Sequence, residues 1–158
     1  MLLTLALTSL AQASDVATTK KFGIGVASGP TGIAATGKFY LTDKAGISGY
    51  IGTSGWYHGF RANFEMEFYE IESWDFGRLD LYWDVGVDLG LWTWGVSTGL
   101  VGVGGGVGIE LQFEKVPASV FVDAGLGIYP VNAYDTIGPK AGFGLIAPRG
   151  AAGGRWYF

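Results

Sequence analysis

The chain has 158 residues, a formal net charge of -4, and a composition that is 49% hydrophobic and only 15% charged. Soluble domains carry about 25% charged residues, so this deficit favours a membrane protein of one domain. The sequence has no cysteine, which excludes a disulfide framework, a thiolate metal site and a cysteine nucleophile. It also has no run of Lys or Arg, which argues against nucleic-acid binding, because cations must cluster to displace counterions from phosphates.

The first thirteen residues are predicted to be a signal peptide. Leu2 to Leu10 form a short apolar run, and Ala11-Gln12-Ala13 provides a cleavage pattern before Ser14. The run is too short to cross a bilayer as a helix, which needs about 20 residues. No Lys or Arg precedes it, so either the true start lies upstream of Met1 or the segment is atypical. We therefore expect export, with residues 14–158 as the mature domain.

Alternation of apolar with polar or small residues predicts strands, since successive side chains of a strand point to opposite sides. The alternation is complete from Leu79 to Leu91, where every odd position is apolar. In chain order, eight strands are predicted: Phe22–Ser28, Thr31–Leu41, Ile47–Ser54, Phe60–Tyr69, Leu79–Leu91, Val101–Glu114, Val120–Tyr129 and a closing strand that ends at Phe158.

The segments between these strands are typical of turns, as in Gly29-Pro30 and Lys115 to Pro117. The region before the last strand fits worst, because Phe143 and Leu145 have the opposite parity from Trp156 and Phe158. A β-bulge, or a long loop before a short last strand, would reconcile them. The pattern predicts an all-β fold: a single antiparallel up-and-down β-barrel of eight strands, with the start of the eighth left open.

Alternation alone fits either a soluble barrel with an apolar lumen, as in lipocalins, or a membrane barrel with an apolar exterior. The polar face is largely glycine, as from Gly102 to Gly108, which suits a tight interior better than a surface in water. Aromatic residues gather near the predicted strand ends, as in the girdles of membrane barrels. We therefore predict a transmembrane barrel surrounded by the lipid bilayer of the bacterial outer membrane.

The closing strand carries Gly154, Trp156 and the terminal Phe158 on one face. Together with the signal peptide and the eight strands, it resembles the small OmpA/OmpX-type outer-membrane barrels. That resemblance implies that the barrel-assembly machinery reads Trp156 and Phe158 as an assembly signal. A family of small outer-membrane barrels of unassigned function is more narrowly similar, in Gly29-Pro30-Thr31-Gly32, the segment Lys38 to Ala45, Val116-Pro117 and the ending Arg155-Trp156-Tyr157-Phe158.

Charged residues on the inward face are predicted to form a network in the lumen. With both termini in the periplasm, six of them lie within about four residues of a periplasmic strand end, which predicts a salt-bridge plug there: Lys38, Glu67, Asp80, Glu110, Asp123 and Arg155. The full inward set has more acids than bases, so we expect some acids to stay protonated or to share a cation or water. It comprises Glu65, Glu67, Asp80, Asp84, Asp88, Glu110 and Asp123 against Lys38, Arg61 and Arg155.

Beyond this plug the inward positions are mostly glycine and alanine, which predicts either a hydrated vestibule or a flattened barrel. No catalytic residue, metal or cofactor is expected. His58 lies near Ser54 in a predicted outward loop, but their spacing is not diagnostic of a lipid-modifying hydrolase. The glycines from Gly102 to Gly106 alternate along a strand with no Lys-Ser/Thr after them, which excludes a phosphate-binding loop.

The Trp92-Thr93-Trp94 tip and the loop from Tyr129 to Pro139 are candidates for an outward-facing binding surface of unknown ligand, although interfacial anchoring is the favoured interpretation. The leading functional hypothesis is a structural or interaction role for a barrel with a filled polar lumen and no catalysis. The alternatives are a narrow solute or ion channel, a lipid-modifying outer-membrane hydrolase and a soluble lipocalin-like binder.

Overall fold

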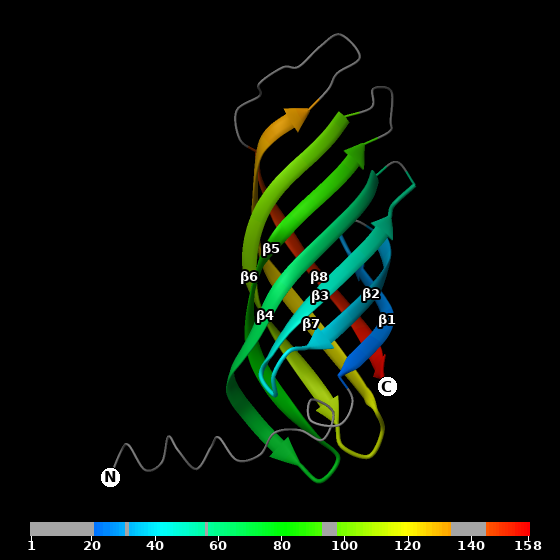
Figure 1. Cartoon of the computed structure of the whole chain (residues 1–158), viewed down its shortest axis with the longest axis vertical. Helices are drawn as coiled ribbons and strands as arrows, with labels where there is room; N and C mark the ends of the chain where they lie inside the picture. Colours follow the sequence, from blue (N-terminus) through cyan, green and yellow to red (C-terminus); the bar gives the residue numbers. More distant parts are fainter. Residues whose placement is uncertain (1–20, 31, 56, 93–97, 134–144) are drawn as a thin grey trace, which may run out of the picture.

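The computed structural model describes residues 21–30, 32–55, 57–92, 98–133 and 145–158. They form antiparallel strands paired in sequence order, and β8 pairs with β1 to close a barrel (Figure 1). The strands are β1 (Phe22–Gly29), β2 (Gly32–Tyr40), β3 (Ala45–Thr53), β4 (Tyr57–Trp74), β5 (Gly77–Trp92), β6 (Thr98–Phe113), β7 (Ala118–Ala133) and β8 (Leu145–Tyr157). The prediction of an all-β, eight-stranded up-and-down barrel is confirmed.

Some sequence predictions concern residues outside the described ranges. The predicted signal peptide is among them, as are Thr93 and Trp94 of the Trp92-Thr93-Trp94 tip and most of the loop from Tyr129 to Pro139. Within the described ranges there is no helix with the length and hydropathy needed to cross a membrane.

The two faces of each strand differ as the alternation requires. On β5, the side chains of Asp84 and Asp88 are buried, whereas those of Val85 and Val87 are about half exposed on the outside. The same division holds around the barrel, where large apolar side chains are exposed on the outer surface, for example Val26, Ile33, Ile51, Phe60, Val103, Leu126 and Ile146. This arrangement is the reverse of a barrel with an apolar lumen and a polar surface.

The eighth strand runs without a bulge against β7, from the pair Ala118–Trp156 to the pair Tyr129–Leu145. β8 begins at Leu145 and has 13 residues, so neither the bulge nor the short last strand that the parity conflict suggested describes it. Pro148 lies on the outer face, at a position that the β1–β8 pairs do not reach, since these stop at Ser28 and Ala152. Proline is tolerated there because no hydrogen bond to β1 is required of its nitrogen.

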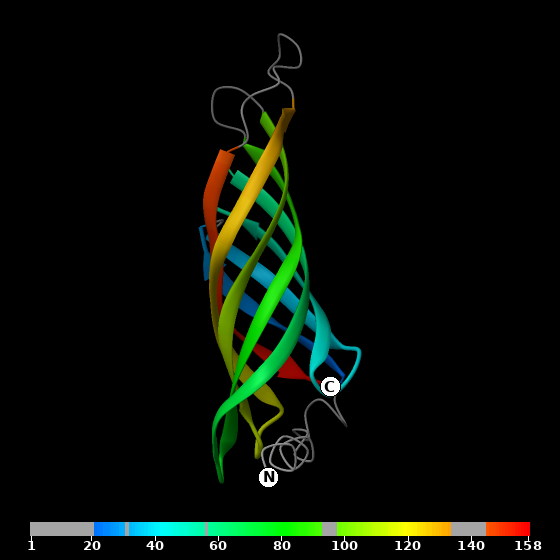
Figure 2. The same cartoon turned by 90° about the vertical axis from the view of Figure 1, so that its left-hand side faces the viewer.

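The strands differ in length, which makes the ends of the barrel uneven. β1, β2 and β3 have 8 or 9 residues, whereas β4 to β7 have 16 to 18. We call the end where β1 begins and β8 ends the terminal end, and the opposite one the distal end. At the terminal end the β4–β5 hairpin projects beyond the other strands, as the green hairpin of Figures 1 and 2 shows.

Candidate functional site: the charged lumen

All ten charged residues of the predicted set lie inside the barrel, and none is more than 9% exposed. The structure adds two buried cations that the sequence reasoning missed, Arg78 and Arg149. The twelve residues form two clusters. The proximal cluster, near the terminal end, comprises Lys38, Glu65, Glu67, Arg78, Asp80, Glu110 and Arg155. The distal cluster comprises Arg61, Asp84, Asp88, Asp123 and Arg149.

Lys38 is the centre of the proximal cluster. Its Nζ lies 2.6 Å from a carboxylate oxygen of Glu110, 3.2 Å from Glu65 and 3.5 Å from Glu67. Lys38 comes from β2 and Glu110 from β6, so this contact crosses the lumen between strands that are not neighbours. A buried amine is stable only when such partners replace the water it has lost.

Glu110 has no exposed surface and is held from several sides. Its Oε1 accepts hydrogen bonds from Ser119 Oγ at 2.5 Å and from the Tyr157 hydroxyl at 2.9 Å. Arg155 lies beside it, with Nη1 3.6 Å from the same oxygen. These contacts link β2, β6, β7 and β8 across the lumen.

Arg78 closes the proximal cluster at the terminal end. Its Nε donates to Asp80 at 2.7 Å, and its Nη2 donates to Glu67 at 3.0 Å. Gln112 Nε2 also donates to Glu67, at 3.0 Å. Arg78 is two residues from Asp80, and Gln112 is two residues from Glu110, so each shares the inward face of its strand. The alternation that predicted the inward acids could therefore have predicted both residues.

The distal cluster is built around two arginines. Arg61 Nε donates to Asp88 at 2.7 Å, and Arg61 Nη1 lies 3.9 Å from Asp123. Arg149 Nη2 donates to the Asn63 amide oxygen at 2.6 Å and lies 3.3 Å from Asp84. Asp123 therefore belongs to the distal cluster, and the prediction that it joins Lys38 in a single plug was wrong. The strands tilt and end at different heights, so equal distance from a strand end does not mean equal depth.

The rings of Tyr50 and Phe121 form an aromatic layer beside Arg155 of the proximal cluster. The two clusters also meet directly, where Glu65 of β4 pairs with Asp84 of β5. The Arg155 guanidinium carbon lies 3.9 Å from the Phe121 ring centroid, and the Tyr50 ring lies 5.6 Å from the guanidinium of Arg61 and 5.7 Å from that of Arg155. Tyr50 and Phe121 pack edge to face, with centroids 6.1 Å apart. Arg155 Nη2 also donates to the Tyr50 hydroxyl at 2.8 Å, which fixes the ring in this layer.

The inward glycines accommodate large side chains from neighbouring strands. A Cβ added to Gly108 would lie 2.4 Å from the Tyr82 ring, and one added to Gly102 would lie 2.4 Å from the Tyr129 ring. The predicted vestibule is therefore largely filled. A cavity of about 30 Å³ remains beside Tyr50, Arg61, Asp88 and Tyr129, which is room for about one water molecule.

The buried charges of the lumen pair with one another across neighbouring and opposite strands. Acids still exceed bases among the buried residues, so protonated acids or a shared cation remain a prediction.

Among the described residues, no group of three potential ligands is placed to hold a metal ion. His58 is exposed, and it lies on β4, paired with Thr53 of β3, so the prediction that it lies in a loop was wrong. Comparisons of this chain with protein-family models, curated proteins and solved structures find no match.

Proposed function

We propose that this chain is an integral protein of the bacterial outer membrane, with a structural or interaction role and no catalysis. The observation that supports it most is the reversed distribution of side chains, with buried charges inside and exposed large apolar side chains outside. In water such an apolar surface would make the molecules associate with one another. In a bilayer the same surface is stable, because it contacts the lipid tails. The soluble lipocalin-like alternative requires the opposite distribution.

The height of the apolar surface fits a bilayer. The outward residues of β5 from Leu79 to Leu91 span about 40 Å of strand, which corresponds to about 30 Å of membrane at a tilt of about 40°. Aromatic side chains are exposed around the terminal end, at Phe22, Phe39, Trp156 and Phe158. Aromatic girdles of this kind mark the boundary between lipid and water. Trp156 and Phe158 also have the exposure that recognition by the barrel-assembly machinery would require.

The filled lumen supports a closed barrel over a channel. The path for a solute would have to cross two charged clusters and the aromatic layer of Tyr50 and Phe121. Removing any one charge would leave its partners buried and unpaired, which is costly. We therefore assign the network a role in holding the eight strands together.

Planar-bilayer recordings test this assignment. The purified barrel is expected to give no single-channel steps, whereas a porin inserted in the same bilayers serves as the positive control. Regular steps from the wild-type barrel would contradict a closed lumen and support the channel alternative. Incubation with lipid A followed by mass spectrometry tests the hydrolase alternative, which predicts a product that His58→Ala abolishes.

A further inference from the structure

The projecting part of the β4–β5 hairpin has a free strand edge. β4 pairs with β3 only as far as the pair Ala45–Met66, after which Glu67 N donates to Lys44 O at 2.8 Å. From there to Trp74, the only strand paired with β4 in the described part of the chain is β5. A closed barrel normally leaves no such edge, because every strand has two neighbours.

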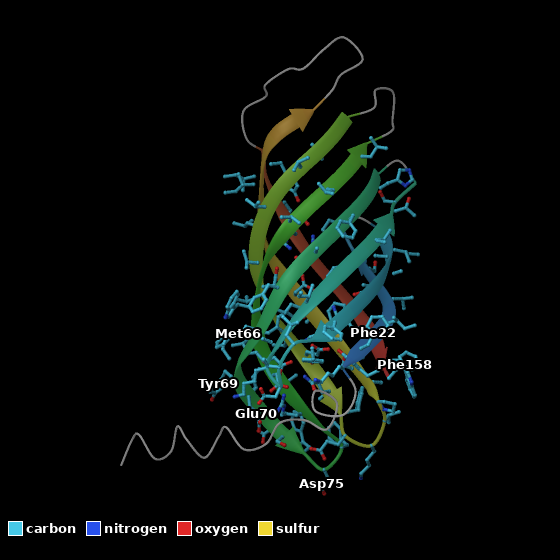
Figure 3. All side chains as sticks on the ribbon, viewed as in Figure 1. Phe22, Met66, Tyr69, Glu70, Asp75 and Phe158 are labelled. Carbon is cyan, nitrogen blue, oxygen red and sulfur yellow. The ribbon has the colours of Figure 1, made fainter. Side chains whose placement is uncertain are left out.

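This segment crosses the end of the apolar band. Leu79 is the last outward apolar residue of β5 and pairs with Glu72 of β4, so the hairpin continues past the band from Ser73 to Arg78. The exposed acids Glu70 and Glu72 lie at the border of the band. Figure 3 shows Tyr69, Glu70 and Asp75 extending past the level of Phe22 and Phe158 at the terminal end. If the barrel spans the membrane as proposed, residues 73–78 stand in the periplasm, and Glu70 and Glu72 lie at the membrane boundary.

Apolar side chains on this hairpin are exposed at the border of the apolar band and beyond it. The exposed fractions are 62% for Tyr69, 43% for Ile71, 40% for Trp74 and 48% for Phe76. The Trp74 and Phe76 rings stack at 5.3 Å and cover each other in part, but Tyr69 and Ile71 belong to the free-edge region. On its other side β5 pairs with β6 as far as the pair Gly77–Phe113, so β4 is the edge strand of a three-stranded sheet here. A further strand would satisfy the backbone groups of its free edge.

The charges on the segment indicate which kind of strand fits. Glu70, Glu72 and Asp75 are exposed and acidic. The nearby Arg78 is occupied by Asp80 and Glu67 inside the barrel. Where β3 stops, a cavity of about 150 Å³ is bordered by Glu67, Glu70 and Asp80 as well as by Lys44 and Arg78. It is large enough for one long side chain.

We propose that the free edge of β4 from Tyr69 to Trp74 binds an extended, basic segment of a periplasmic protein by strand addition. The backbone of the partner pairs with β4. Because of the register shift, Glu70 pairs with the inward Asp80 and Glu72 with the outward Leu79, so cationic side chains on both faces of the partner strand lie beside the two acids. A second copy of this chain fits poorly, because antiparallel self-pairing centred on Glu70, Ile71 or Glu72 sets glutamates opposite glutamates. This inference rests on the proposed membrane orientation.

The test uses synthetic peptides and the folded barrel in phosphatidylcholine nanodiscs. A dye-labelled octapeptide in which pairs of lysines alternate with pairs of valines carries lysine on both faces of the strand. It is titrated with barrel-containing nanodiscs and followed by fluorescence anisotropy, with empty nanodiscs as the baseline. We expect saturable binding of this peptide and no binding of its glutamate–valine counterpart. A lysine–valine peptide methylated at every amide nitrogen should also fail to bind, because it has no backbone donors.

A pair of charge-reversed variants locates the contact. Glu70→Lys combined with Glu72→Lys should weaken binding by about tenfold or more, since two attractive cross-strand pairs become repulsive. The matched control, Asp43→Lys with Glu114→Lys, makes the same change in net charge in neighbouring turns and should leave the affinity within about threefold. Heat-dependent gel mobility verifies that every variant is folded.

Several outcomes would overturn the inference: no binding of the basic peptide, equal binding of the acidic or methylated peptide, or equal losses in the two variants. Concentration-dependent self-association through the same edge would also overturn it, in favour of a homodimer. A barrel that integrates in membranes and shifts on gels but fails these tests retains the proposed function. If the chain neither integrates in membranes nor shifts on gels, the proposed function itself is contradicted.

Discussion

Replacing Lys38 with methionine removes the cation on which three buried carboxylates converge. Methionine has a similar length, so the change removes charge with little loss of volume. Lys38 is 1% exposed, and its Nζ lies 2.6, 3.2 and 3.5 Å from oxygens of Glu110, Glu65 and Glu67. Removing one partner of a buried ion pair costs about 3–5 kcal/mol, and we expect Lys38→Met to fall toward the upper end.

The assay is reversible urea unfolding in phosphatidylcholine vesicles, followed by tryptophan fluorescence. Lys115→Met is the control, because Lys115 is exposed in the turn between β6 and β7 and should change stability by less than about 0.5 kcal/mol. The double variant Lys38→Met/Glu110→Gln should recover about 2 kcal/mol relative to additivity. Glutamine removes the uncompensated charge and retains an acceptor for Ser119 and Tyr157.

The magnitude decides the interpretation. Exposed ion pairs contribute about 0–1 kcal/mol, so a loss below about 1 kcal/mol for Lys38→Met would refute the claim that the proximal cluster holds the strands together. Full additivity of the two substitutions would likewise show that Lys38 and Glu110 do not stabilise each other.

Two further predictions concern packing and the outer surface. Gly108→Ala should destabilise the barrel by about 1–3 kcal/mol in the same assay, because its Cβ would meet the Tyr82 ring at 2.4 Å, whereas Gly49→Ala, with its nearest atom at 3.7 Å, should be close to neutral. Equal effects at the two positions would contradict the packing of tyrosine over glycine. Val107→Arg, on the outer face of β6, should cost about 2–4 kcal/mol in vesicles, whereas Val116→Arg in the adjoining turn should cost less than about 1 kcal/mol. If Val107→Arg is neutral, that surface does not face lipid.

The strands were predictable where the alternation is uninterrupted. β5 was predicted from Leu79 to Leu91 and runs from Gly77 to Trp92. β4 was predicted to end at Tyr69 but continues to Trp74, because register shifts between Glu67 and Tyr69 and between Glu70 and Glu72 break the period of two. The free edge of β4 could not be predicted either, because the sequence pattern did not show that β4 continues past Tyr69.

The inward position of each charged side chain could be predicted from its parity in the strand. The identity of its ion-pair partner could not. Which acid meets which base depends on strand tilt and on pairing across the lumen, as in the contact between Lys38 and Glu110, which are 72 residues apart. Arg149 was missed because it lies in the region where the parity conflict obscured β8. The glycine face suggested open space, yet Tyr82 stands directly opposite Gly108 in the β5–β6 register and fills it.

The central claim is that the closed barrel resides in the outer membrane, with its apolar face in lipid. The most direct measurement compares the gel mobility of unheated and heated outer-membrane fractions that contain the protein. A closed membrane barrel resists detergent denaturation, so we predict a band in the membrane fraction that migrates differently before and after heating. A soluble protein whose mobility does not change on heating would contradict the account.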